Sequence, residues 1–287
     1  MAEALPCATL SRALEEPLYG TASVVRGWVL LEQPGPWGVD AVTESRLDRD
    51  LARALQRAAA AAHLRLLLIR RPGRPGGPGE RRGGLPVDRE ASRSSACFVA
   101  HTSRQGRWLE RRRLDNPAEL LELDMAKVVA GERPHFGEEA TEPVYLACTN
   151  ARHDRCCATY GRPLALALQA SHGELVWESS HVGGDRFAGN LVCLPDGHYF
   201  GRVGPDDAAR VVDRHRKGTL DLDLLGRDRL EGDVAAVRFA RAGGGQVRVL
   251  VRADRAANPR MLTCHSVHPE APLGFTLLEL SEAPGGR

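Results

Sequence analysis

Residues 144–171 read VYLACTNARHDRCCATYGRPLALALQAS, and this stretch decides the fold that we expect for the chain. It begins with an apolar run that ends at Cys148 and has the length of a buried strand. A mostly polar segment follows, as in a loop, and from residue 155 the Ala and Leu content is that of a helix, which Asp154 can cap. The stretch therefore predicts a strand, a loop and a helix, with Cys148 and Cys157 on either side of the loop.

The same succession of elements can be followed on both sides of this stretch. Upstream, apolar runs and helix-forming segments predict strands at 28–32, 64–69, 96–101 and 107–114, with helices at 47–63 and 117–129. In the second half the strands are expected at 144–148, 175–179, 191–194 and 198–203, with helices at 155–171 and 205–216. Both halves have the order β-α-β-β-β-α, which predicts an α/β (α+β) fold with an internal duplication of structure.

The chain is long enough for two domains, each with a core of its own. We expect an N-terminal lobe over residues 17–131, a second lobe over 141–220, and a C-terminal extension over 221–287 that packs on the second lobe. A Gly-, Pro- and Arg-rich linker is expected from Arg71 to about Ser95. In the extension, the pattern predicts a helix at 230–240 and strands at 247–252, 261–265 and 275–280.

Composition argues against several classes of protein. The formal net charge is only +2, which argues against nucleic-acid binding. No apolar run approaches the roughly 18 residues of a membrane span. The N-terminus lacks the basic patch and apolar core of a secretory signal, so we expect a cytoplasmic protein that does not bind membranes. The seven cysteines are an odd number, which favours metal or redox chemistry over a disulfide framework.

The functional prediction depends on two loops of the second lobe. Eight residues separate Cys148 from Cys157, and the N-terminus of the predicted helix lowers the pKa of a thiol in its first turn. A second loop follows the next strand, contains paired glycines, and carries His181 and Asp185 four residues apart. Two such loops can converge on a two-iron cluster, with thiolates on one iron and the other pair of ligands on the second. The spacing therefore predicts a [2Fe-2S] site.

Four stretches of the sequence resemble one known family. They cover residues 145–163, 180–190, 19–23 and 31–38. Together they are similar to the sucrase/ferredoxin-like family, over about residues 17–265. The resemblance implies a thioredoxin-like ferredoxin lobe, and with it a duplicated thioredoxin-like fold, and for cluster-binding relatives it implies two Cys and two His ligands. Cys148 and Cys157 match the cysteines and His181 matches the first histidine, whereas Asp185 stands at the position of the second.

This replacement leaves the identity of the fourth ligand open. Asp185 ranks first, through a carboxylate oxygen, and the alternatives are Cys156, Cys193, Cys264 and His265. With an oxidised core counted as 2+, two thiolates, one imidazole and one carboxylate give a net charge of minus one, whereas a bis-histidine site is neutral. We therefore expect a lower reduction potential than that of a bis-histidine site, and one that depends on pH if His181 is a ligand.

The remaining cysteines have simpler interpretations. Cys97 and Cys193 lie in apolar strands and are expected to be small buried hydrophobic side chains. Cys7 is expected to be exposed. Adjacent cysteines cannot easily form a disulfide with each other, so one of the pair at 156 and 157 is expected to be a spectator, and Cys157 is favoured as the ligand.

The predicted function is electron transfer or redox sensing rather than catalysis, with a redox partner protein that the sequence does not identify. The sequence predicts no oligomeric state. One alternative is a cluster-free thiol oxidoreductase that uses Cys156 or Cys157, with His153 nearby, although a Cys-x-x-Cys motif is missing. Another is a mononuclear zinc site with a structural role at the same four residues. No carboxylate pair indicates sugar hydrolysis, despite the name of the family.

Overall fold

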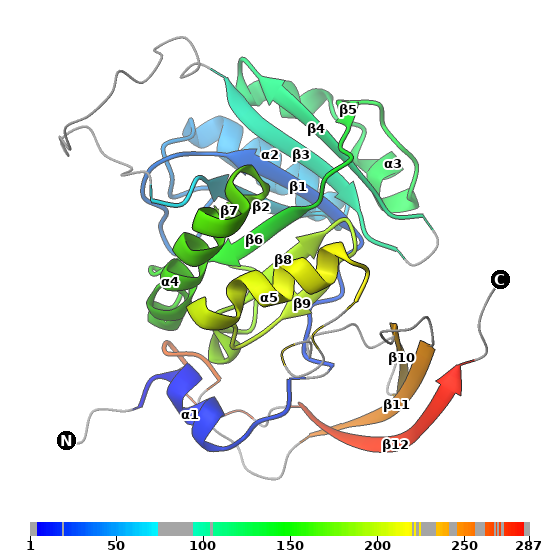
Figure 1. Ribbon diagram of the computed structural model, residues 1–287. Helices are drawn as coiled ribbons and strands as arrows, with labels where there is room; N and C mark the ends of the chain where they lie inside the picture. Colours follow the sequence, from blue (N-terminus) through cyan, green and yellow to red (C-terminus); the bar gives the residue numbers. More distant parts are fainter. Residues whose placement is uncertain are drawn as a thin grey trace.

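A large curled sheet and a smaller separate sheet make up the architecture (Figure 1), which is of the mixed α/β class. The computed structural model describes the chain apart from residues 1–4, 19, 74–93, 104–105, 220, 222–223, 225–233, 241–245, 256–261, 267, 269, 271–272 and 284–287. The large sheet has nine strands and the small one has three. No helix in the described ranges has the length and apolar character that a membrane crossing requires.

The first half of the large sheet follows the predicted order of elements. These are β1 (Gly27–Glu32), α2 (Arg49–Ala61), β2 (Arg65–Arg70), β3 (Ser95–His101), β4 (Trp108–Leu114), the 3-10 helix η1 (Pro117–Glu122), α3 (Met125–Ala130) and β5 (Glu138–Glu139). The single helix expected at 117–129 is wrong. It is divided in two because Leu123 is extended and Asp124 caps a new helix, accepting a hydrogen bond from the N–H of Lys127 at 3.2 Å.

The second half contains the stretch 144–171 and matches the predicted order closely. Its elements are β6 (Val144–Cys148), α4 (Arg155–His172), η2 (Gly173–Leu175), β7 (Val176–Ser179), η3 (Asp185–Phe187), β8 (Leu191–Leu194), β9 (His198–Phe200) and α5 (Pro205–Arg216). Asp154 caps α4, as predicted, by accepting a hydrogen bond from the N–H of Cys156 at 2.8 Å. The strand, loop and helix expected from the sequence are therefore confirmed.

The strand pairing is the same in the two halves. The order in the large sheet is β5-β4-β3-β1-β2-β7-β6-β8-β9. In the first half, β1 is parallel to β2 and antiparallel to β3, and β3 is antiparallel to β4. In the second half, β6 is parallel to β7 and antiparallel to β8, and β8 is antiparallel to β9. The halves meet edge to edge, where β2 pairs antiparallel with β7.

An ion pair joins the two halves at this seam. Arg70 of β2 lies opposite Glu178 of β7, and its guanidinium is 2.7 Å from the Glu178 carboxylate. The same carboxylate accepts a hydrogen bond from the hydroxyl of Thr149 at 2.9 Å. Because Thr149 directly follows Cys148, the seam also fixes the start of the loop that carries the cysteines.

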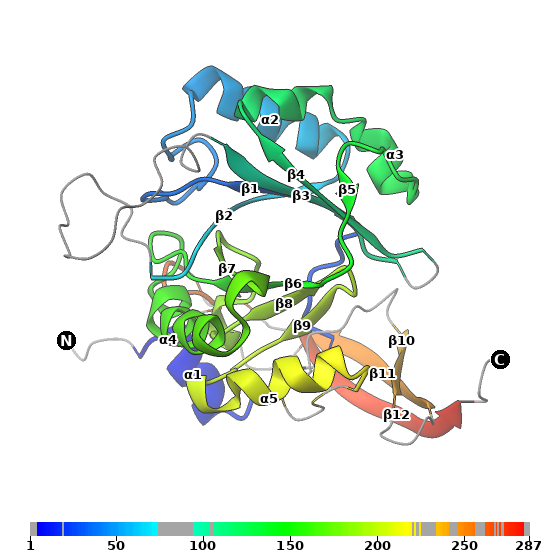
Figure 2. The ribbon, with the colours of Figure 1, turned by 45° about the horizontal axis from the view of Figure 1, so that its top comes forward.

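The curled sheet encloses a central apolar core. Successive side chains of a strand point to opposite faces, so Val29 and Leu31 of β1 pack under α2 while Trp28 and Leu30 face the interior between the halves. Figure 2 shows α2 and α3 outside one half and α4 and α5 outside the other. Cys148 of β6 faces the central core, which removes its thiol from solvent.

The C-terminal part differs most from expectation. It forms an antiparallel sheet of β10 (Val234–Ala240), β11 (Gln246–Arg255) and β12 (Leu273–Ala283). The helix expected at 230–240 is wrong over its described residues, because each residue of β10 pairs with β11 and this pairing outweighs the helix propensity of its alanines. The strand expected at 261–265 is also wrong, since residues 262–265 form bends and a turn. The other two expected strands lie within β11 and β12.

One further helix, α1 (Cys7–Ala13), is not predicted by the sequence pattern. It packs against the second half, where Cys7 and Ala8 share a small apolar cluster with Cys156 and Ala188. Most of the expected linker from 71 to 95 lies outside the described residues.

Candidate metal centre

Cys148 and Cys157 are brought together by the close packing of β6 and α4. Cys148 ends the strand and Cys157 lies in the first turn of the helix, and both are almost completely buried. Gly161, one turn further along α4, makes the approach possible, because a Cβ at this position would collide with the backbone carbonyl of Cys148. The two thiols therefore face each other inside the central core.

His181 is positioned by two anchored neighbours in the loop after β7. Ser180 exchanges two hydrogen bonds with Leu68 of β2, one from its backbone N–H at 2.8 Å and one to its hydroxyl at 3.1 Å. Arg65 donates to the carbonyl of Val182 at 2.9 Å. The loop is therefore attached to β2 on both sides of His181, which directs the imidazole towards the cysteines.

Asp185 completes this group from the start of η3. Its Oδ1 lies 3.1 Å from the Cys157 sulfur and 3.0 Å from His181 Nδ1, and the carboxylate is buried. The Cys157 sulfur is 4.0 Å from His181 Nδ1. Ligand atoms of Cys148, Cys157 and His181 all lie within 4.8 Å of one another. The structure thus brings together the four residues on which the sequence prediction depends, Cys148, Cys157, His181 and Asp185, which we call the first group. Their roles as ligands stay a prediction.

His153 is a further member of this site. Its ring stacks on that of His181 with centroids 3.6 Å apart, and its Nε2 lies 4.0 Å from Asp185 Oδ2. Nδ1 lies 3.4 Å from the carbonyl oxygen of Val39, and Nε2 is directed at the Asp185 carboxylate. His153 is not among the ligands predicted from the sequence, although its place between the two cysteines in the loop is a usable signal.

Hydrogen bonds within the site shift the pKa values of its side chains. Burial disfavours protonation of His181, but its hydrogen bond to Asp185 and its contact with Cys148 outweigh this and raise the pKa of the imidazole to about 9. The hydrogen bond from Cys157, assisted by His181, holds the pKa of Cys148 well below its usual range in spite of burial. The pKa of Cys157 is raised, first by its hydrogen bond to Cys148 and then by burial. Both shifts favour a thiolate at Cys148 beside a protonated His181 in the metal-free protein.

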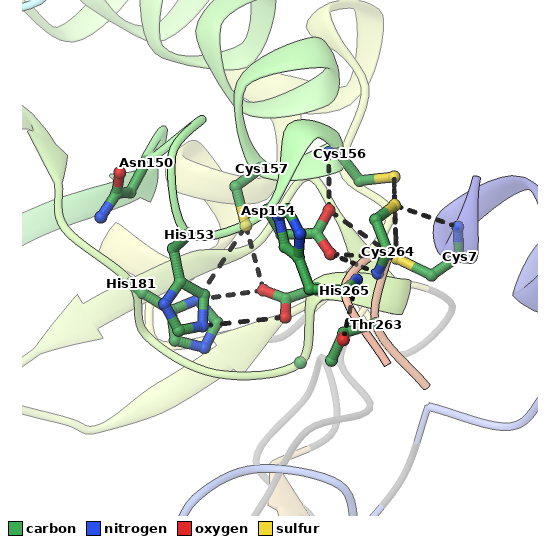
Figure 3. Close-up of polar contacts among 12 residues, drawn as sticks. Cys7, Asn150, His153, Asp154, Cys156, Cys157, His181, Thr263, Cys264 and His265 are labelled. Atoms are coloured by element: carbon green, nitrogen blue, oxygen red, sulfur yellow. Dashed lines mark hydrogen bonds and ion pairs between the residues drawn. The ribbon is translucent and has the colours of Figure 1, made fainter. Parts of the chain in front are cut away.

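A second group of thiols lies on the other side of α4 (Figure 3). It contains Cys7 of α1, Cys156 of α4, Cys264 from the turn at 262–265, and the capping carboxylate of Asp154, with ligand atoms all within 4.8 Å of one another. The expectation that Cys7 is exposed is wrong, since it is only 3% exposed. Cys156 and Cys264, considered as alternative ligands of the predicted cluster, belong to this second group.

The other two alternative ligands lie elsewhere. Cys193 of β8 packs in the core under α4 and α5 with Tyr145 and Phe200, and burial raises the pKa of its thiol. His265 is exposed and lines an open cavity of about 400 Å³. The cavity is also lined by Val39, Arg152, His153, Asp185 and Thr263. The cavity opens next to His153 and Asp185, on the side of the first group away from its thiols.

The donor atoms of the first group suit an iron-sulfur cluster. Thiolate sulfur and imidazole nitrogen are the ligands of two-iron centres with mixed coordination, and a carboxylate oxygen can complete the set. The thiol side is buried in an apolar core, whereas the His181 side chain is 22% exposed. Buried sulfur ligands and a partly exposed imidazole edge are compatible with a redox centre, because burial and solvent access both tune its potential.

The fold and this group of side chains define an α/β protein with a buried thiol, imidazole and carboxylate site able to bind a metal. The chain belongs to the sucrase/ferredoxin-like family, whose sequence profile matches residues 18–225. The resemblance seen in the sequence is therefore confirmed.

Two solved structures are similar to a part of the chain. Both are cysteine-to-serine variants of the thioredoxin-like [2Fe-2S] ferredoxin from Aquifex aeolicus. One is 18% identical over 31% of this chain and 100% of its own, with a TM-score of 0.27. The other is 20% identical over 29% of this chain and 97% of its own, also with a TM-score of 0.27. No curated protein matches the sequence.

Proposed function

We propose that the protein is an electron carrier or redox sensor that binds a [2Fe-2S] cluster. Cys148 and Cys157 bind one iron, and His181 and Asp185 bind the other. The observation that carries this proposal is the convergence of two separate loops, which places thiols, an imidazole and a carboxylate in one largely buried group. Such a cluster supplies one-electron transfer. Membership of a family described as ferredoxin-like supports the same function.

The surroundings of the site favour electron transfer over catalysis at a thiol. Cys148 is 1% exposed and Cys157 is 0% exposed, so a protein substrate cannot reach either sulfur. This argues against the cluster-free thiol oxidoreductase. His153 and His181 instead present their stacked rings near the open cavity. A redox partner protein would approach on this side, where the His181 side chain is 22% exposed.

His153 is the most suitable replacement for Asp185 as fourth ligand. Its Nε2 is 4.0 Å from Asp185 Oδ2, so a modest rotation exchanges one donor for the other. Asp185 would then orient the imidazole of His181, to which it is already hydrogen bonded. The two arrangements differ by one unit of charge on the cluster, and so in reduction potential.

We further propose that the two halves of the large sheet are duplicated thioredoxin-like lobes, over residues 17–131 and 141–220, followed by an extension over 221–287. The support is the identical strand order and pairing direction on each side of the seam. The first lobe carries no matching cysteine pair in its loop at 33–38. It instead supports the second lobe, since the carbonyl of Gly38 accepts a hydrogen bond from the Asn150 side chain at 3.2 Å.

One observation favours a second candidate, a mononuclear zinc site. Separations of 3.0 to 4.0 Å between donors of Cys157, His181 and Asp185 are near the roughly 3.5 Å expected for two ligands of one tetrahedral ion. A zinc site would have a structural role and no colour. Iron and sulfide analysis distinguishes the two candidates directly.

The test is the metal and sulfide content of protein purified without oxygen. We expect iron and acid-labile sulfide in equal amounts, with the visible absorption of a [2Fe-2S] cluster, in the wild-type protein. Cys148→Ala should lose both. Cys193→Ala is the matched control, because it removes another buried thiol from a neighbouring strand of the same sheet. Colourless wild-type protein without sulfide, whose zinc content falls in Cys148→Ala, would support the second candidate and exclude the first.

A further inference from the structure

Three distant segments of the chain meet at the second thiol group. Cys7 and Cys156 are 149 residues apart, and Cys156 and Cys264 are 108 residues apart. One thiol comes from α1, one from the first turn of α4 and one from the turn at 262–265 (Figure 3). Chain segments this far apart are costly to hold together, since each closure removes loop entropy.

The three sulfur atoms form a nearly equilateral triangle. The separations are 3.7 Å between Cys7 and Cys156, 3.5 Å between Cys156 and Cys264, and 3.6 Å between Cys264 and Cys7. Tetrahedral zinc binds thiolates at about 2.3 Å, which places two sulfur ligands about 3.8 Å apart. One ion can therefore bind all three sulfurs with little movement. A disulfide would instead bring two sulfurs to about 2.05 Å and leave the third out.

Asp154 supplies a fourth donor at the right separation. Its Oδ2 lies 3.6 Å from the Cys7 sulfur, near the roughly 3.5 Å expected between an oxygen and a sulfur ligand of one zinc ion. The carboxylate is fully buried and accepts N–H hydrogen bonds from Cys156 at 2.8 Å and Cys264 at 2.7 Å. Each carboxylate oxygen has two lone pairs, so these bonds leave a position for the metal.

Backbone donors complete the surroundings of the sulfurs. The N–H of Cys7 points at the Cys264 sulfur at 3.5 Å, and the N–H of Ala8 is hydrogen bonded to Cys156. Such N–H groups offset the negative charge that thiolates bring to a metal site, and they hold the ligands in orientation. The N-terminus of α4 adds its positive partial charge at Asp154 and Cys156.

We propose that Cys7, Cys156, Cys264 and Asp154 bind one structural zinc ion, separate from the centre at Cys157. Four protein ligands close the coordination shell, which is typical of structural rather than catalytic zinc. The ion joins α1 and the turn at 262–265 to the start of α4. That turn carries Thr263 and His265, so the zinc also maintains one wall of the cavity next to His153.

The experiment measures zinc, iron and sulfide in the same samples of full-length protein purified without oxygen. We expect about one zinc per chain in the wild type, falling by about tenfold or more in Cys7→Ser and in Cys264→Ser. Iron and sulfide should stay unchanged in both variants, which also shows that they fold. Cys97→Ser, which alters a buried cysteine in the first half, should keep its zinc. Cobalt substituted for zinc should give the visible bands of a tetrahedral ion and thiolate charge-transfer absorption.

A Cys148→Ala background separates this proposal from the proposed function. That variant lacks the first centre, whichever metal the first centre binds. It should therefore retain one zinc ion, and this ion should be lost when Cys7→Ser is added. The proposal is overturned if this background holds no zinc, or if zinc content is the same in Cys7→Ser, Cys264→Ser and the parent. It is also overturned if the anaerobic protein has a mass lower by two hydrogens because Cys156 and Cys264 are oxidised to a disulfide.

Discussion

Cys156 and Cys157 are neighbours in the first turn of α4, yet their sulfur atoms belong to different groups of side chains that could bind a metal. The Cys157 sulfur lies 3.1 Å from Asp185 Oδ1, whereas the Cys156 sulfur lies 3.5 Å from that of Cys264. Successive helix residues point about 100° apart. One helical turn can therefore direct its two thiols into two separate groups.

The two adjacent cysteines should have reciprocal effects on metal content. We expect Cys157→Ala to lose iron and sulfide and keep its zinc, because only the Cys157 sulfur faces His181. Cys156→Ala should lose zinc and keep iron and sulfide. Each variant is the control for the other, since both remove one buried thiol from the same turn. Loss of both metals in both variants would show that the two groups form one centre.

Replacement of Asp185 should change the reduction potential. A carboxylate ligand gives the oxidised cluster a net charge of minus one, and Asp185→His would make it neutral. We expect the potential to rise by on the order of 100 mV, because a less negative cluster accepts an electron more readily. Redox titration monitored by visible absorption measures the shift.

The control for this prediction is Glu174→Gln. It removes a carboxylate from the same half of the sheet, but the Glu174 side chain is 84% exposed, so solvent screens its charge. The potential of this variant should stay close to that of the wild type. An unchanged or lower potential in Asp185→His would mean that Asp185 is not a ligand and would favour His153 instead.

Local sequence signals predicted those helices, caps and strands that depend on residues close together in the chain. The helix at α4 and its cap by Asp154 follow from residue type and position, and the two loops converge because both follow strands that run parallel in the sheet. The helix expected at β10 shows the opposite case. Its alanines favour a helix in isolation, but the pairing with β11 comes from residues outside the segment.

The second thiol group could not be predicted for a related reason. Cys7 lies before the first predicted strand and Cys264 lies in the extension, so no spacing rule connects them to Cys156. Their proximity depends on how α1 and the turn at 262–265 pack on α4, which is a long-range property of the fold. An odd number of cysteines indicated metal chemistry in general, but it could not assign these three residues to one site.

The contribution of His181 to the stability of the metal-free protein should fall as the pH rises. The pKa of His181 is raised from 6.5 to about 9 in the folded state, against the effect of burial, by the hydrogen bond to Asp185 and by the contact with Cys148. A group with a raised pKa stabilises the fold fully below its unfolded value, and this contribution is lost as the pH rises through the folded value. We expect the His181 contribution to the unfolding free energy to fall by about 3 kcal/mol between about pH 6 and about pH 10, while the lowered pKa of Cys148 acts in the opposite direction.

Urea unfolding of metal-free protein at these two pH values measures the effect. His181→Gln, which cannot be protonated, should lack this loss, and the change attributable to His181 is the difference between the two proteins. If both lose the same stability, the imidazolium of His181 does not stabilise the fold.

Gly161 should be intolerant of any side chain. A Cβ at this position would collide with the carbonyl of Cys148, so Gly161→Ala must move α4 away from β6. We expect a loss of about 3 kcal/mol in unfolding free energy, as for other overpacked interiors. The cysteines at 148 and 157 lie on the two elements that separate, so iron and sulfide content should also fall. Gly106→Ala is the matched control, since the nearest atom to its Cβ is a serine hydroxyl at 3.9 Å. A Gly161→Ala protein with wild-type stability and a full cluster would show that the contact between α4 and β6 does not determine the site.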